Sequence, residues 1–88
     1  MTTKNNKDLA KHTLAELAPG DVATVDTFGS VGQTVRRIMT LGINPGATVK
    51  LIRKAPLGDP LELEVSGCLL TLRAEDAAGV LVNEVRHG

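Results

Sequence analysis

The segment "LELEV", residues 61–65, alternates strictly between aliphatic and acidic side chains, and this period of two most constrains the fold. Successive side chains of a β-strand point to opposite faces of the sheet. Leu61, Leu63 and Val65 would therefore face a core, while the two glutamates between them face water. This pattern is typical of an antiparallel strand with one buried face. We expect the core to be built against a sheet.

Four further segments have the composition of strands, and turn residues separate them at intervals of about 8–12 positions. They cover residues 21–28, 47–54, 68–73 and 80–85, and a helical turn is expected at 74–79. Five short strands with one short helix predict a mainly β protein, a small SH3-like barrel, with an OB-fold as the alternative.

A single short helix is expected between the first two strands. Ser30 and Gln33 have the spacing of a capping box, and Gly42 is placed to end the helix with a positive φ. The apolar residues between them recur at the spacing of one helical face: Val31, Val35, Ile38 and Met39.

Proline and glycine define the turns on either side of the second strand. Pro45 and Gly46 precede that strand, and the segment "APLGDP", residues 55–60, follows it. Within this segment Pro56 fixes φ, Gly58 is free to adopt a positive φ, and Pro60 stiffens the start of the third strand. We expect a rigid turn here.

The turn at 55–60 does not have the sequence of a phosphate-binding loop. Gly58 has no lysine beside it, and a strand rather than a helix follows. The apolar Leu57 at the tip either contacts a partner or packs over the end of the barrel. Leu57 and Asp59 are therefore candidate partner-binding residues.

Composition and charge bound the remaining possibilities. The 88 residues are enough for one small domain, which we place at 13–86 after a flexible tail at 1–12. Ten basic and ten acidic residues cancel, and Phe28 is the single aromatic residue, so a nucleic-acid surface is disfavoured. The polar N-terminus, the lone cysteine and the lack of a long apolar run favour a cytosolic protein.

No metal, cofactor or catalytic site is expected. Cys68 would share a buried strand face with Leu70 and Leu72, as a small core residue. His12 lies in the predicted tail and His87 at the other end, so a histidine pair would require the termini to meet. Without a nucleophile beside a base, the chain does not resemble an enzyme.

The remaining candidate contacts are arginines. Arg36 and Arg37 would lie on the helix face opposite Val35 and Ile38, either solvated or facing an acidic partner. Arg73 at the end of the fourth strand precedes two acidic residues and is expected to form a local ion pair or strand-end contact.

Four segments in order resemble the FeoA family of bacterial ferrous-iron uptake proteins. They read "LAPGDVATV", "RRIMTLGINPGATVKLI", "APLGDPLELEV" and "LLTLRAEDAAGVLV", and the likeness spans about residues 13–85. The resemblance implies an SH3-like barrel with a helix inserted after the first strand. Iron-dependent repressors carry the same barrel type, but no helix-turn-helix precedes it here.

The resemblance also implies a function. FeoA proteins are small cytosolic accessories of FeoB, a membrane transporter for Fe²⁺ that carries a GTP-binding domain, and they are not known as enzymes. A non-catalytic adaptor that docks on the transporter and tunes iron uptake is the leading hypothesis. The alternatives are a nucleic-acid-binding small barrel and a GTPase-activating partner that inserts Arg36 or Arg37 as a finger.

Overall fold

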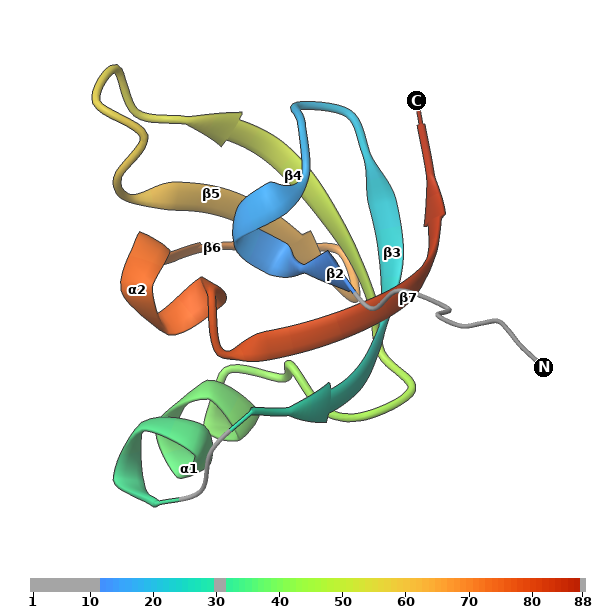
Figure 1. Ribbon diagram of the computed structural model, residues 1–88, viewed down its shortest axis with the longest axis vertical. Coiled ribbons are helices and arrows are strands. Elements are labelled where there is room, and N and C mark those ends of the chain that lie inside the picture. Colours follow the sequence, from blue (N-terminus) through green and yellow to red (C-terminus); the bar gives the residue numbers. More distant parts are fainter. Residues whose placement is uncertain (1–11, 30–31, 88) are drawn as a thin grey trace, which may run out of the picture.

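The computed structural model describes residues 12–29 and 32–87, which form one antiparallel sheet of six strands. The strands are β2 (His12–Thr13), β3 (Val22–Phe28), β4 (Thr48–Lys54), β5 (Leu61–Val65), β6 (Cys68–Leu72) and β7 (Val80–Arg86). Their order across the sheet is β2-β7-β3-β4-β5-β6. The sheet curls into a small barrel (Figure 1), which confirms the predicted mainly β architecture.

Three short helical segments accompany the described strands: the 3-10 helix η1 (Leu14–Glu16), α1 (Gln33–Thr40) and α2 (Ala74–Ala77). Figure 1 shows α1 beyond the end of β3, and α2 in the connection from β6 to β7. None of the described helices is long and apolar enough to cross a membrane.

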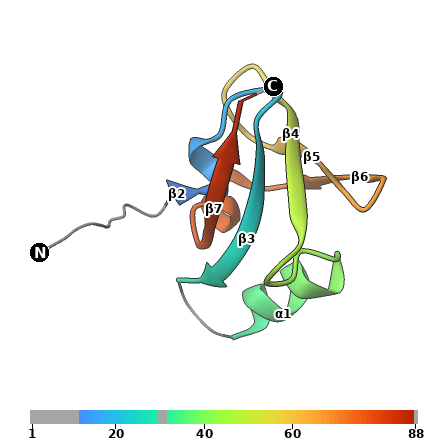
Figure 2. The same cartoon turned by 90° about the vertical axis from the view of Figure 1, so that its right-hand side faces the viewer.

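Irregular strand pairing lets the sheet close on itself. The register of β3 against β7 shifts twice, and that of β4 against β5 shifts once, between Leu51 and Arg53. Each such bulge bends its strand and increases the local twist. The long strands β3 and β4 can therefore curve from one side of the barrel to the other (Figure 2).

The core is aliphatic, as the near-absence of aromatic residues requires. Leu14 and Leu17 enter it from the chain around η1, so this N-terminal segment belongs to the folded body. The buried hydrophobic residues are Leu14, Leu17, Ala23, Val25, Ile38, Ile43, Val49, Leu51, Leu61, Leu63, Val65, Leu72, Ala77, Val80 and Val82.

The start of α1 differs from the sequence prediction. Gly32, with a φ of 121°, is the N-cap residue, and no side-chain hydrogen bond caps the helix. Gln33 is therefore the first helical residue rather than the third, and the predicted capping box is wrong. Ser30 and Val31 lie outside the described residues. A Thr-x-x-Glu pair does cap η1, where the Glu16 carboxylate accepts from the backbone N–H of Thr13 at 3.3 Å.

Two further predictions are corrected by the position of each residue in the sheet. His12 is not part of a tail, because it pairs with Val82 in the short β2–β7 ladder. Met39 was placed on the buried face of α1 but is 37% exposed, and Ile38 is the buried residue of this helix. A helix that covers only the end of the barrel buries a narrower face than the sequence period suggests.

Cys68 is exposed rather than buried, so the core assignment is wrong. It pairs with Val65 and therefore shares the core-facing side of the sheet. However, it lies at the turn end of β6, the last strand of the described sheet, and the β5–β6 hairpin projects from the body there (Figure 2). Its strand face is correct, but that end of the face carries no covering layer.

Candidate docking surfaces

The turn between β4 and β5 presents an apolar side chain on a rigid frame. The N–H of Gly58 donates to the carbonyl of Ala55 at 2.7 Å, and the N–H of Ala55 donates to the carbonyl of Pro60 at 3.0 Å. Gly58 has a φ of 83°, a conformation that favours glycine. Leu57 is 96% exposed, so it does not pack over the barrel end.

Asp59, in the same turn, has a structural partner. Its Oδ1 accepts from the backbone N–H of Ala74 at 3.0 Å, and Ala74 is the first residue of α2. A carboxylate at a helix start satisfies a free amide and suits the helix dipole. The turn at 55–60 is therefore tied to α2 through Asp59, while Leu57 stays exposed.

The turn before β4 fixes the position of α1. Gly42 follows the C-cap Leu41 with a φ of 99° and donates its N–H to the carbonyl of Met39 at 3.0 Å. In the turn formed by Pro45 and Gly46, the N–H of Gly46 donates to the carbonyl of Val25 at 2.8 Å. These bonds hold the helix and its exposed arginines against the end of β3.

The two arginines of α1 differ in their surroundings. Both are exposed, but Arg37 Nη2 lies 2.6 Å from Asp76 Oδ2, an ion pair that joins α1 to α2. Arg36 and Arg37 both line a shallow surface pocket with Gln33 and Thr34. Asp76 pairs with Arg37 of α1, so this carboxylate is not the local ion-pair partner expected for Arg73.

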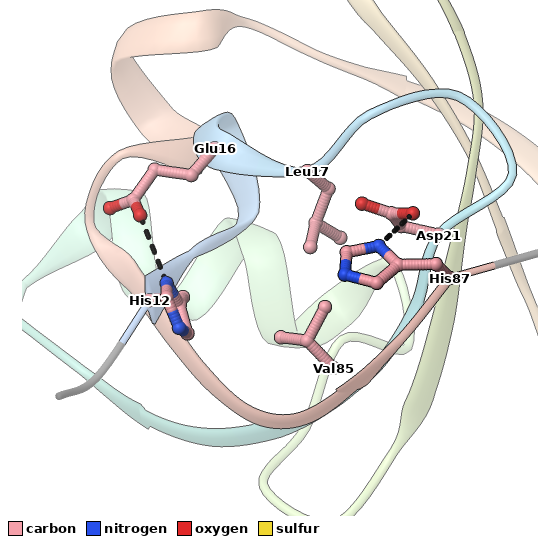
Figure 3. A pocket seen from close by; sticks show the side chains of 6 residues that line it. All are labelled: His12, Glu16, Leu17, Asp21, Val85 and His87. Atoms are coloured by element: carbon pink, nitrogen blue, oxygen red, sulfur yellow. Dashed lines mark hydrogen bonds and ion pairs between the residues drawn. The ribbon is translucent and has the colours of Figure 1, made fainter. Parts of the chain in front are cut away.

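The N- and C-terminal segments meet in a second surface pocket, shown in Figure 3. His12 Nδ1 lies 3.2 Å from Glu16 Oε1, and His87 Nδ1 lies 2.8 Å from Asp21 Oδ1. Leu17 and Val85 complete the lining. Apart from the two histidines, no pattern in the sequence indicates that these segments meet, because their meeting depends on the pairing of β2 with β7.

Hydrogen bonds lower the pKa of both carboxyl groups in this pocket. For Asp21 the main cause is the backbone N–H of Ala18, which donates to Oδ2 at 2.9 Å, and His87 contributes in the same direction. For Glu16 the contact with His12 lowers the pKa most. Each histidine is thus paired with its own carboxylate. Among residues 12–29 and 32–87, no group of three His, Cys, Asp or Glu side chains could hold a metal ion.

Comparison with known proteins is consistent with this architecture. The FeoA domain family model matches residues 12–84. FeoA from Chlorobium tepidum is 43% identical, with a TM-score of 0.76 over 82% of this chain and 69% of that one. The FeoA of Stenotrophomonas maltophilia, described as an SH3 domain protein and complexed with zinc, is 28% identical. Its TM-score is 0.76, over 86% of this chain and 96% of that one.

A longer relative links this domain to a transporter. The chain is 35% identical over 69 residues to the Fe(2+) transport protein A/Fe(2+) transporter FeoB fusion protein of Porphyromonas gingivalis. The match covers 78% of this chain but spans only 8% of the fusion protein. The fold and these matches define an SH3-like domain of the class associated with iron transport. The chain belongs to the FeoA family.

Proposed function

We propose that this protein is a non-catalytic accessory of ferrous iron uptake that docks on the cytoplasmic part of an FeoB-type transporter. The observation that carries the proposal is the Porphyromonas gingivalis relative, in which an FeoA region and an FeoB transporter share one chain. Joining two domains in one chain raises the effective concentration of each near the other, and this favours a contact between them. Where the two proteins are separate chains, affinity at a docking surface has to supply that proximity.

The exposed surface supports a docking role. Leu57 stands on a turn braced by two backbone hydrogen bonds and by Asp59, so binding there would cost little conformational entropy. Arg37 is held by the ion pair with Asp76, and Arg36 presents an exposed positive charge on the same helix. We assign partner contact to Leu57 and Arg36, with Asp59 and Arg37 holding the surrounding surface in place.

Isothermal titration calorimetry tests the proposal. This chain is titrated with the purified cytoplasmic part of the FeoB-type transporter from the same organism. We expect saturable binding with a defined stoichiometry. A parallel GTP hydrolysis assay separates plain docking from GTPase activation. A large rise in hydrolysis that Arg36→Ala abolishes would favour the arginine-finger alternative. Absence of binding would overturn the docking proposal.

A further inference from the structure

The outer edge of β6 is an unused hydrogen-bonding surface. β6 is the last strand of the described sheet, and β5 is its neighbour on one side. The turn that joins them consists of Ser66 and Gly67, with φ values of 54° and 80°. Two consecutive positive φ values identify a two-residue type I′ hairpin turn. In such a turn Val65 and Cys68 form a hydrogen-bonded pair.

The register of the hairpin then determines which backbone groups point outward. Hydrogen-bonded and non-hydrogen-bonded pairs alternate along an antiparallel ladder. Since Val65 and Cys68 form a bonded pair, the pair of Leu63 with Leu70 is also bonded. The N–H and C=O groups of Leu69 and Thr71 therefore point away from β5. Within the described part of the chain, no hydrogen bond joins them to another element.

Among the described residues, this edge also lacks the protection that sheet edges usually carry. Natural edge strands are blocked by charged residues, prolines, bulges or a covering segment. β6 reads Cys-Leu-Leu-Thr-Leu, with no charge and no proline, and its pairing with β5 has no bulge. Leu69 is 72% exposed on the face that points away from the core. The edge is therefore competent to pair with another strand.

The surroundings of the edge indicate the chemistry of its partner. A groove beside the second half of β6 is lined by Leu41, the C-cap residue of α1, by Thr71 and Leu72 of β6, and by Arg37, Arg73 and Asp76. The ion pair between Arg37 and Asp76 balances two of the three charges in this groove. Arg73 is exposed and supplies the remaining positive charge.

We propose that β6 accepts an extended, acidic segment of the transporter's cytoplasmic part as a seventh strand. This inference rests on the docking function proposed above and adds the edge of β6 to the residues that contact the partner. The added strand would exchange up to four backbone hydrogen bonds with Leu69 and Thr71. If the partner strand runs antiparallel to β6, the partner residue opposite Arg73 lies four positions before the partner residue opposite Leu69. Both partner residues then point to the sheet face that carries Leu69. A carboxylate on the partner residue opposite Arg73 would pair with the guanidinium, and an apolar side chain on the partner residue opposite Leu69 would cover that exposed leucine.

A second copy of the chain is a poorer occupant of the same edge. An antiparallel β6–β6 pair centred on Leu70 would place Leu69 opposite Thr71 of the other copy. Arg73 would then lie opposite the uncharged Gly67, so its charge would gain no partner. An acidic segment satisfies both the backbone groups and Arg73, and this charge complementarity favours it.

The test compares Thr71→Pro with the control Thr71→Val, using titration against the transporter's cytoplasmic part. Proline removes the outward N–H of residue 71 and blocks strand addition, but it leaves the inward ladder to β5 in place. Valine keeps the N–H and suits a strand. We expect Thr71→Pro to weaken binding at least about tenfold and Thr71→Val to leave it unchanged. Arg73→Gln should weaken binding less and reduce its dependence on salt.

Amide hydrogen exchange on the wild-type chain provides a readout that needs no variant. In the free protein, the amides of Leu69 and Thr71 should exchange quickly and that of Leu70 slowly. Binding of the transporter's cytoplasmic part should slow exchange at Leu69 and Thr71 in particular. If the wild type binds but these two amides stay fast, or Thr71→Pro binds normally, the strand-addition proposal is wrong while docking stands.

Two other outcomes have separate meanings. A wild-type chain that does not bind removes the docking function and this proposal together. Concentration-dependent self-association in sedimentation that Thr71→Pro abolishes would assign the edge to a second copy, and it would overturn the acidic-segment proposal.

Discussion

Strands β5 and β6 carry nearly the same pattern of aliphatic residues and are paired residue by residue, yet they are buried to different extents. In β5, Leu61, Leu63 and Val65 are all buried. The equivalent face of β6 runs from exposed Cys68 at the turn to buried Leu72 at the other end. Alternation determines which face a side chain joins, but burial requires a second layer over that face. In the described part of the sheet, β5 lies between β4 and β6, whereas β6 has β5 as its single neighbour.

The largest expected effect tests this difference directly. Leu63→Ala in β5 should cost about 2–5 kcal/mol of unfolding free energy, because the cavity lies in the interior of a small core. Cys68→Ala on the same sheet face should change it by less than about 0.5 kcal/mol, as for an exposed position. Urea unfolding measures both. Similar costs for the two substitutions would mean that Cys68 is packed after all.

The second prediction concerns Asp21, the one buried charged residue in the described part of the chain. Asp21→Asn should lower the melting temperature at neutral pH, by less than Leu63→Ala does, because Asn is a weaker acceptor for the N–H of Ala18.

The pH dependence of this effect has a definite sign. The pKa of Asp21 lies below its ordinary value of 3.8 in the folded state, chiefly because the backbone N–H of Ala18 donates to the carboxylate. The stabilisation is therefore complete above that ordinary value, and it is lost as the pH falls through the lower folded pKa. Melting temperatures of wild type and Asp21→Asn should converge under acid conditions. A constant difference down to the lowest pH would contradict the assignment.

The strands were predictable because their side chains repeat with a period of two or are rich in β-branched residues. The predicted third strand has the bounds of β5, the predicted fourth runs one residue past β6 to Arg73, and the turn residues mark the ends of the others. The β2–β7 pairing was missed because a two-residue strand has no period. Met39 and Cys68 were assigned to the core because the sequence shows the period of an element and not where the covering layer ends.

The candidate surface was only partly accessible to sequence reasoning. An apolar residue between Pro56 and Gly58 suggested a rigid tip, but packing and exposure of Leu57 were equally compatible with that pattern. Arg37 and Asp76 are 39 positions apart, and their ion pair depends on the barrel bringing α1 beside α2. Contacts of this kind follow from topology, which local pattern does not encode.

The third prediction concerns the thiol of Cys68. An exposed thiol at the turn end of β6 should react fully with a maleimide in the native protein, at a rate close to that in denaturant. Cys68→Ser should lose the reaction and keep the melting temperature. Slow labelling that becomes fast only on unfolding would restore the buried assignment and remove the contrast between the two strands.

The smallest effect on stability is expected at Leu57, in the turn that precedes β5. Leu57→Ser should change the unfolding free energy by less than about 0.5 kcal/mol, because the side chain is 96% exposed and has almost no packing to lose. Its effect on binding to the transporter's cytoplasmic part is the informative quantity. If the turn and the edge of β6 form one surface, Leu57→Ser and Thr71→Pro should both weaken binding. If only Thr71→Pro does so, the docking surface is the β6 edge and Leu57 is a solvent-exposed residue of the connecting turn.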